Sequence, residues 1–179
     1  MTNQGTRIPS RCSSGSPVAF KWFDGIRRSE PDHVQLAVEA CLRAVDSDTR
    51  VWNPFAKAMV KSEFKKRIER AALGQLVPVE EVKPVGQQPS PPPLYEIRWQ
   101  DIAVTDRAPG AAPQDAVFSK VIVRMYHSEP ATLPDHFIGH HVHEKIISPA
   151  GDTHLLQDTE INVAAGYFNL GEASNWAAL

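Results

Sequence analysis

The apolar residues of this chain change their spacing at residues 86–93 (GQQPSPPP), and this change constrains the fold more than any other feature. Before the stretch, apolar residues recur every three or four positions, and after it they alternate with polar residues. The first spacing is typical of amphipathic helices and the second of half-buried strands. Because the prolines exclude a helix across the stretch itself, we expect helices first, an extended linker at 86–93, and then a sheet.

Two helices are expected before the linker, over residues 31–45 and 54–73. The first has proline and acidic residues at its start, which suits the positive end of a helix. The second ends at Gly74, a typical C-cap, and has one apolar side formed by Phe55, Met59, Phe64, Ile68 and Ala72. Its cations, which include Lys65, Lys66 and Arg67, form either a solvated face or a ridge that faces nucleic acid.

Strands are expected over residues 94–99, 118–127 and 137–147, which are rich in alternating, β-branched and aromatic residues. The run 18–23 is a candidate first strand or apolar anchor, and 77–85 has room for a short edge strand. We expect a long loop at 101–115 and a final helix from about residue 158 to 171. The order of the segments predicts an α+β fold, a small antiparallel sheet packed against N-terminal helices and followed by a C-terminal helix.

Length and composition predict one domain over residues 18–179. A chain of 179 residues with 42% hydrophobic side chains can bury one core, whereas residues 1–17 are too polar to offset the entropy of ordering and are expected to be a disordered tail. Without a long apolar run or a secretion signal, we expect a cytoplasmic protein with no membrane partner. Cys12 lies in that tail, and Cys41 has the position of a small buried thiol.

The stretch 139–145 (GHHVHEK) holds three of the seven histidines. Strand alternation places His141, His143 and Lys145 on one face and His140 on the other. A neighbouring ammonium disfavours a metal, so we expect no metal or cofactor. A metal site of His140, His141 and His143, with His136 or His154, remains a lesser alternative. Two imidazoles beside an ammonium suit proton transfer at a phosphate, as in RNA cleavage by a 2′-hydroxyl, while the simplest alternative is a strand edge with structural histidines.

Four motifs occur in order along the second half of the chain: Leu94-Tyr95-Glu96-Ile97-Arg98, Arg124 with Tyr126, His143-Glu144-Lys145, and Gln157 with Glu160-Ile161 and Ala164. Over about residues 94–170 this series resembles the RelE/ParE superfamily of toxins, in particular its HigB-like and phage-derived branch. The resemblance implies an antiparallel sheet with N-terminal helices on one face and an active or binding concavity on the other. It also implies a metal-independent, ribosome-associated mRNA endonuclease that is neutralised by an antitoxin protein.

The same resemblance assigns roles to residues by position. Arg98 and Arg124 would hold the scissile phosphate, Lys145 would support its developing charge, and His143 would act as acid or base. The RNA would also contact Tyr126, whose ring can stack on a nucleobase, together with His141 and the helix cations Lys65, Lys66 and Arg67. Tyr95 and Arg98 point to opposite faces of an unbroken strand, and we prefer Arg98 for the site.

The charge of the chain is unevenly distributed. Residues 1–93 contain 14 Lys and Arg against 10 Asp and Glu, whereas residues 94–179 contain 5 against 11. An acidic half suits a basic partner better than RNA, because phosphate contacts dominate affinity for nucleic acid. The alternative function is therefore a non-catalytic inhibitor from a phage or mobile element, built on the same scaffold, that binds a host protein.

Overall fold

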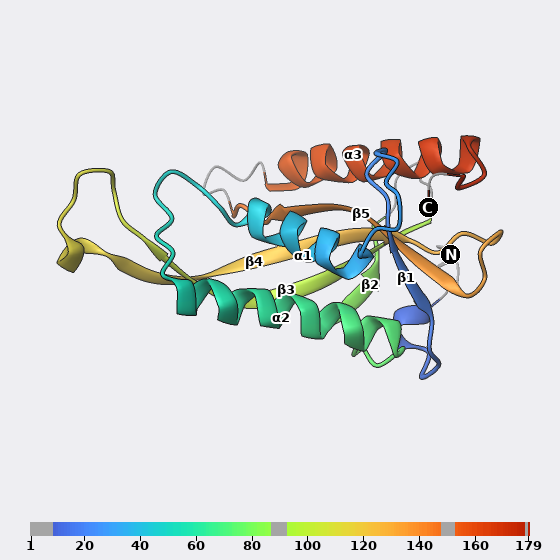
Figure 1. The fold of residues 1–179 in the computed structure, drawn as a ribbon, viewed down its shortest axis with the longest axis horizontal. Coiled ribbons are helices and arrows are strands. Elements are labelled where there is room, and N and C mark those ends of the chain that lie inside the picture. Colours follow the sequence, from blue (N-terminus) through green and yellow to red (C-terminus); the bar gives the residue numbers. More distant parts are fainter. Residues whose placement is uncertain (1–8, 87–92, 148–152, 178) are drawn as a thin grey trace, which may run out of the picture.

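The computed structural model describes residues 9–86, 93–147, 153–177 and 179, which form one sheet with helices on both of its faces (Figure 1). Within these residues the sheet has five strands in the order β1-β5-β4-β3-β2. Their bounds are β1 Ala19–Trp22, β2 Val82–Pro84, β3 Leu94–Asp106, β4 Val117–Ser128 and β5 His136–Glu144. The α+β class is confirmed.

The sheet is mixed, so the expectation of an antiparallel sheet is wrong at one edge. Strands β2, β3, β4 and β5 pair antiparallel, whereas β1 pairs parallel with β5. Antiparallel neighbours can be joined by tight turns, but parallel strands need a long crossover. Strand β1 meets this condition because two helices and three strands separate it from β5 in the chain.

Helices α1 (His33–Ala44) and α2 (Pro54–Ala72) cover one face of the sheet, as expected, and begin close to the predicted positions. Each has a side-chain cap: Asp32 accepts from the Gln35 amide, and Asn53 accepts from the Ala56 amide. These caps satisfy backbone donors that a helix start leaves free. The contact with the sheet is centred on Phe64 of α2, whose ring meets Trp99 of β3 edge to face at 5.4 Å.

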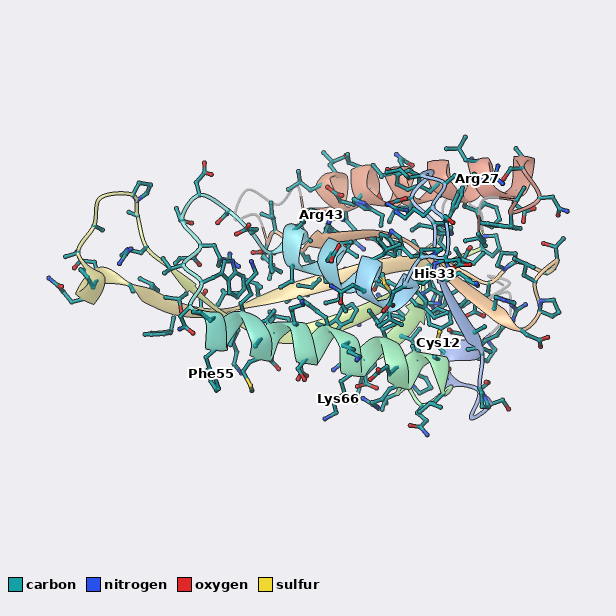
Figure 2. All side chains as sticks on the ribbon, viewed as in Figure 1. Cys12, Arg27, His33, Arg43, Phe55 and Lys66 are labelled. Atoms are coloured by element: carbon teal, nitrogen blue, oxygen red, sulfur yellow. The ribbon has the colours of Figure 1, made fainter. Side chains whose placement is uncertain are left out.

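The buried side of α2 differs from the expected one. Phe55 and Met59 are 75% and 58% exposed, and Phe55 points away from the sheet in Figure 2. The buried positions are Val60, Phe64, Ile68 and Ala71. The buried residues Val60, Phe64 and Ile68 are spaced four residues apart. Met59 precedes Val60 by one residue, so its side chain is rotated by about 100° around the helix and points away from the sheet. Phe55 lies one turn earlier on the same side as Met59.

Helix α3 (Thr153–Ala173) packs on the opposite face, over β4 and β5, and begins about five residues before its predicted start. Ile161 and Ala164 pack against Leu94 and Tyr126. Further along, Phe168 meets Trp176, which lies beyond the end of α3 and packs with Phe23 and Ile138. The face opposite α1 and α2 is therefore covered by a helix over its β4 and β5 strands.

The long loop expected at 101–115 is shorter than the sequence indicates. Strand β3 continues to Asp106, which pairs with Val117, and a 3-10 turn (Pro113–Asp115) lies within the remaining connection. The pairing of β3 with β4 shifts between Trp99 and Ile102. A bulge of this kind interrupts the alternation of apolar and polar side chains. The sequence pattern therefore does not indicate the second half of the strand.

The expected disordered tail, residues 1–17, is wrong over the part that the structure describes. Residues 1–8 lie outside the described residues, but Cys12 is fully buried in a 3-10 turn (Arg11–Ser13). The Arg11 guanidinium donates to the carbonyls of Leu133 and His136 at 3.0 and 2.9 Å. Specific contacts with the β4–β5 connection thus anchor a segment of low hydrophobicity.

The predicted linker at 86–93 lies mostly outside the described residues, since only its two ends are placed. Among the helices that are described, none is both long and apolar enough to cross a membrane.

Candidate functional site

A bulge in β5 changes the arrangement of the clustered histidines. On β4, Tyr126 pairs with His141 but the next residue, His127, pairs with Gly139, so His140 is an extra residue in β5. Such a residue breaks the strict alternation of a strand. The prediction that His140 faces away from His141 and His143 is therefore wrong. The His140 ring stacks on Trp176 and meets Phe168 of α3, while His141 contacts Glu160 of α3.

The strand register aligns polar residues in two rows across the sheet. In the first row, Glu96 of β3 pairs with Lys83 of β2 and with Tyr126 of β4, which in turn pairs with His141 of β5. In the second row, Arg124 pairs with Arg98 on one side and with His143 on the other. Lys145 follows His143 by two residues. We call this set the polar sheet face: Lys83, Glu96, Arg98, Arg124, Tyr126, His141, His143 and Lys145.

A single buried carboxylate organises the cations of the polar sheet face. Glu96 is 1% exposed and accepts from Arg124 Nη1 at 2.7 Å. Lys83 Nζ lies 3.3 Å and Arg98 Nε 3.5 Å from its other oxygen. Burial lowers the pKa of Lys145, and the positive charges of Arg124 and Arg98 lower it further. Three cations thus contact one carboxylate, and Lys145 lies within range of their charges, which leaves local positive charge in a half of the chain that is acidic as a whole.

His143 is held as a neutral imidazole. Its ring stacks on Tyr126 with centroids 5.4 Å apart, and its Nε2 lies 3.2 Å from the Tyr126 hydroxyl. Burial lowers the pKa of His143, as do the nearby His141 and Arg124, although Glu160 acts in the opposite direction. A neutral ring near pH 7 has a lone pair that can accept a proton.

His141 is the partner of a carboxylate from α3. Its Nε2 lies 2.5 Å from Glu160 Oε2, and its ring is parallel to that of His143 with centroids 6.3 Å apart. Burial raises the pKa of the Tyr126 phenol, which stacks on His143, so it stays protonated. The two imidazoles therefore have different surroundings, His141 beside a carboxylate and His143 stacked on a phenol.

A cavity of about 50 Å³ lies between this end of β5 and the first turns of α3. It is lined by His143, Glu144, Lys145, Ile146, Thr153, Leu156, Gln157 and Glu160. That volume accommodates a water molecule or two but no nucleobase. A larger ligand would therefore lie along the rim of the polar sheet face, where Lys83 and Arg98 retain 37% and 17% exposure of their side chains.

The residues predicted to be catalytic meet on this face. They come from three separate segments of the sequence: Arg98, Arg124, and His143 with Lys145. Strand pairing places Arg98 and His143 on either side of Arg124, and the charges of both arginines act on Lys145. Tyr126 and His141 lie in the neighbouring row. Tyr95 and Arg98 lie on opposite faces, as expected, since Tyr95 packs against His127 on the other side of the sheet.

The helix cations predicted to bind RNA do not join this group. Lys65, Lys66 and Arg67 belong to α2, on the opposite face of the sheet. Lys65 pairs with Glu69 on its own helix. Arg67 lies 5.9 Å from the Trp99 ring centroid and pairs with Glu81. Burial lowers the pKa of Arg67, and its contacts are those of a residue that joins α2 to the sheet.

Glu96, Lys83 and Glu160 take part in the polar contacts of this site, although the sequence predicts no role for them. A signal was present for Glu96, since alternation places it on the same face as Arg98. No local signal existed for Lys83 and Glu160, because strand pairing brings Lys83 to Glu96 and helix packing brings Glu160 to His141. No protein-family model, no curated protein and no solved structure matches the chain.

Proposed function

We propose that the polar sheet face binds the phosphates of an RNA strand, and that the protein is a metal-independent endoribonuclease of the RelE/HigB toxin type. In this proposal it acts on ribosome-bound mRNA and is neutralised by an antitoxin protein. The observation that supports it best is the gathering of Arg98, Lys145 and His143 on one face, next to an excess of cations over carboxylates.

The proposed reaction is an internal phosphoryl transfer. His143, neutral near pH 7, takes the proton from a ribose 2′-hydroxyl, and the oxygen attacks the adjacent phosphorus. The new bond is phosphorus to 2′-oxygen, and the bond to the 5′-oxygen breaks, which leaves a 2′,3′-cyclic phosphate. His141, held by Glu160 at 2.5 Å, returns a proton to the departing 5′-oxygen.

The cations of the site have unequal roles in this proposal. Lys145 and Arg98 lie at the rim and stabilise the charge that develops on the phosphate oxygens. Arg124 is only 3% exposed and is engaged by Glu96, so it is a positioning residue that holds the row together. This role differs from the direct phosphate contact that the resemblance implies.

The test is cleavage of mRNA by the purified protein, with and without ribosomes, together with growth after expression in bacteria. Wild-type protein should arrest growth and leave fragments that end in a cyclic phosphate, also in the presence of a chelator. His143→Ala and Lys145→Ala should abolish both effects with unchanged circular dichroism. Lys120→Ala is the matched control, because this lysine is 66% exposed and lies on the distant part of β4.

Intact mRNA after incubation of the folded wild-type protein with translating ribosomes would contradict the proposal. Equal activity of the His143→Ala and Lys120→Ala proteins would contradict the assignment of the base.

A second candidate function, a non-catalytic inhibitor that binds a host protein, is favoured by the outer side of α3. Leu156, Val163 and Leu170 are 42%, 38% and 57% exposed, and their seven-residue spacing aligns them on one side of the helix. An apolar stripe of this kind suits a helical partner. Capture of one host enzyme by the wild-type chain but not by Val163→Asp, without RNA cleavage, would favour this function.

A further inference from the structure

A second group of chemically reactive side chains lies on the α1 and α2 side of the sheet, opposite the polar sheet face. It consists of Cys12 from the N-terminal turn, His127 from β4 and Glu129 just beyond β4. Cys12 and His127 are fully buried, and the Glu129 side chain is 5% exposed. Figure 2 shows Cys12 where the N-terminal turn meets the end of α2.

We propose that Cys12, His127 and Glu129 bind a zinc ion. Cysteine sulfur, histidine nitrogen and carboxylate oxygen are the ligand types that zinc prefers, and their three ligand atoms lie within 4.8 Å of one another. Among the described residues, no other group of histidine, cysteine and acidic side chains meets in this way.

The separations between the ligand atoms match those across a tetrahedral zinc ion. Cys12 Sγ lies 3.6 Å from His127 Nε2, and that nitrogen lies 3.2 Å from Glu129 Oε1. Zinc bonds of about 2.3 Å to sulfur and about 2.0–2.1 Å to nitrogen and oxygen, at tetrahedral angles, give separations of roughly 3.6 and 3.3 Å. The side chains therefore need little rearrangement to receive the ion.

Hydrogen bonding accounts for the position of Glu129, which accepts from the Ser10 hydroxyl and the Arg11 amide, but only in part for the contacts at His127. Both Cys12 Sγ and Glu129 Oε1 face the same ring nitrogen of His127, which has at most one proton to donate. The other ring nitrogen, Nδ1, has no hydrogen-bond partner among the described residues, and an ion at Nε2 would not change that. A cation placed between Cys12 Sγ, His127 Nε2 and Glu129 Oε1 would attract a lone pair from each of them.

The charges also balance. A thiolate, a carboxylate and a neutral imidazole around Zn²⁺ carry no net charge, which suits a buried site beside the Phe137 and Tyr95 rings. A cation, Arg11, lies at the edge of the site, with its Nε 3.9 Å from Glu129 Oε2. Burial raises the pKa of the Cys12 thiol, so binding near pH 7 should release a proton from Cys12. The fourth ligand would be water or the Ser10 hydroxyl, which lies 2.5 Å from Glu129 Oε1.

All three ligand side chains are buried, and Ser10 as the fourth would complete a coordination sphere made of protein alone, which is characteristic of structural rather than catalytic zinc. Cys12 belongs to the segment that Arg11 anchors, and the other two ligands lie at the end of β4 and just beyond it. An ion would thus fasten the N-terminal segment to the sheet, and its binding would be coupled to the folding of that segment.

The test is a titration of Zn²⁺ into chelator-treated full-length protein, followed by calorimetry and thermal unfolding. We expect one zinc per chain and a higher unfolding temperature for the wild type. Cys12→Ala should lose both effects. Cys41→Ala, the matched control with an equally buried thiol, and His141→Ala, from the histidine cluster, should keep both.

Cobalt(II) gives a second measurement on the wild-type protein, which remains decisive if Cys12→Ala does not fold. One thiolate ligand should produce a thiolate-to-cobalt charge-transfer band with the visible spectrum of a tetrahedral site. The proposal is overturned if the folded wild type binds no zinc, if the cobalt complex lacks the thiolate band, or if His141→Ala rather than Cys12→Ala abolishes binding.

Discussion

The buried ion pair between Glu96 and Arg124 offers the sharpest test of how the polar sheet face is held together. The side chains are 1% and 3% exposed and meet at 2.7 Å. Glu96→Gln keeps the shape of the side chain but removes its charge, so Arg124 remains as a buried cation without a counter-ion. Breaking a buried pair in this way costs about 3–5 kcal/mol of unfolding free energy. The contacts to Lys83 and Arg98 are more exposed and add less than about 1 kcal/mol each.

The measurement is urea unfolding at pH 7, followed by circular dichroism. Asp101→Asn is the control, because Asp101 and its partner Lys120 are 69% and 66% exposed, and exposed pairs contribute about 0–1 kcal/mol. Glu96→Gln combined with Arg124→Met should lose less than the sum of the two single variants, since the buried charge leaves with its partner. A loss below about 1 kcal/mol for Glu96→Gln would refute the reasoning, because Arg124 would then not depend on the carboxylate.

Three other predictions concern the core. Burial lowers the pKa of His140 from 6.5 to about 3. Between these pH values the unfolded chain binds a proton that the folded chain does not, so the free energy of unfolding should fall by about 2 kcal/mol from pH 7 to pH 5. In urea unfolding, His140→Phe should lack this contribution to the pH dependence of stability. Gly171→Ala would bring a Cβ to 2.1 Å from Trp176 and should lower the melting temperature. Gly166→Ala, whose Cβ would have nothing within 4 Å, should instead raise the free energy of unfolding by about 0.5–1 kcal/mol. Equal melting temperatures of the two variants would contradict this prediction. Phe64→Ala should lower the free energy of unfolding by about 3–5 kcal/mol, because its ring is buried in the core. Phe55→Ala, at a position that is 75% exposed, should lower it by about 0.5 kcal/mol or less. Denaturant midpoints measure both effects.

The helices and the central strands are predictable because their signals are local. The apolar stripe of α1 and the alternation in β3 follow from neighbours within one or two turns or a few strand positions, and caps such as Asn53 mark where a helix begins. The errors occur where the local signal is interrupted. The bulge after Trp99 hides the second half of β3, and the polar composition of residues 9–17 hides the contacts that Arg11 makes with distant carbonyls.

The candidate site was predictable in part for the same reason. Alternation correctly placed Arg98, His143 and Lys145 on faces that the sheet could bring together. It could not give the burial of Arg124 against Glu96, nor the position of the helix cations on the other side of the sheet. Those depend on which strand pairs with which and on the face that each helix covers.

The sequence by itself determined the α+β class, the approximate position of each long helix and strand, and the chemical types gathered in the histidine stretch. The tertiary structure decided that a bulge brings His140 to the same face as His141 and His143, and that Cys12 meets His127 across 115 residues of sequence. The physical reason is the range of the interactions: periodicity arises between near neighbours, whereas a site arises from strand register and burial, which the whole chain sets together.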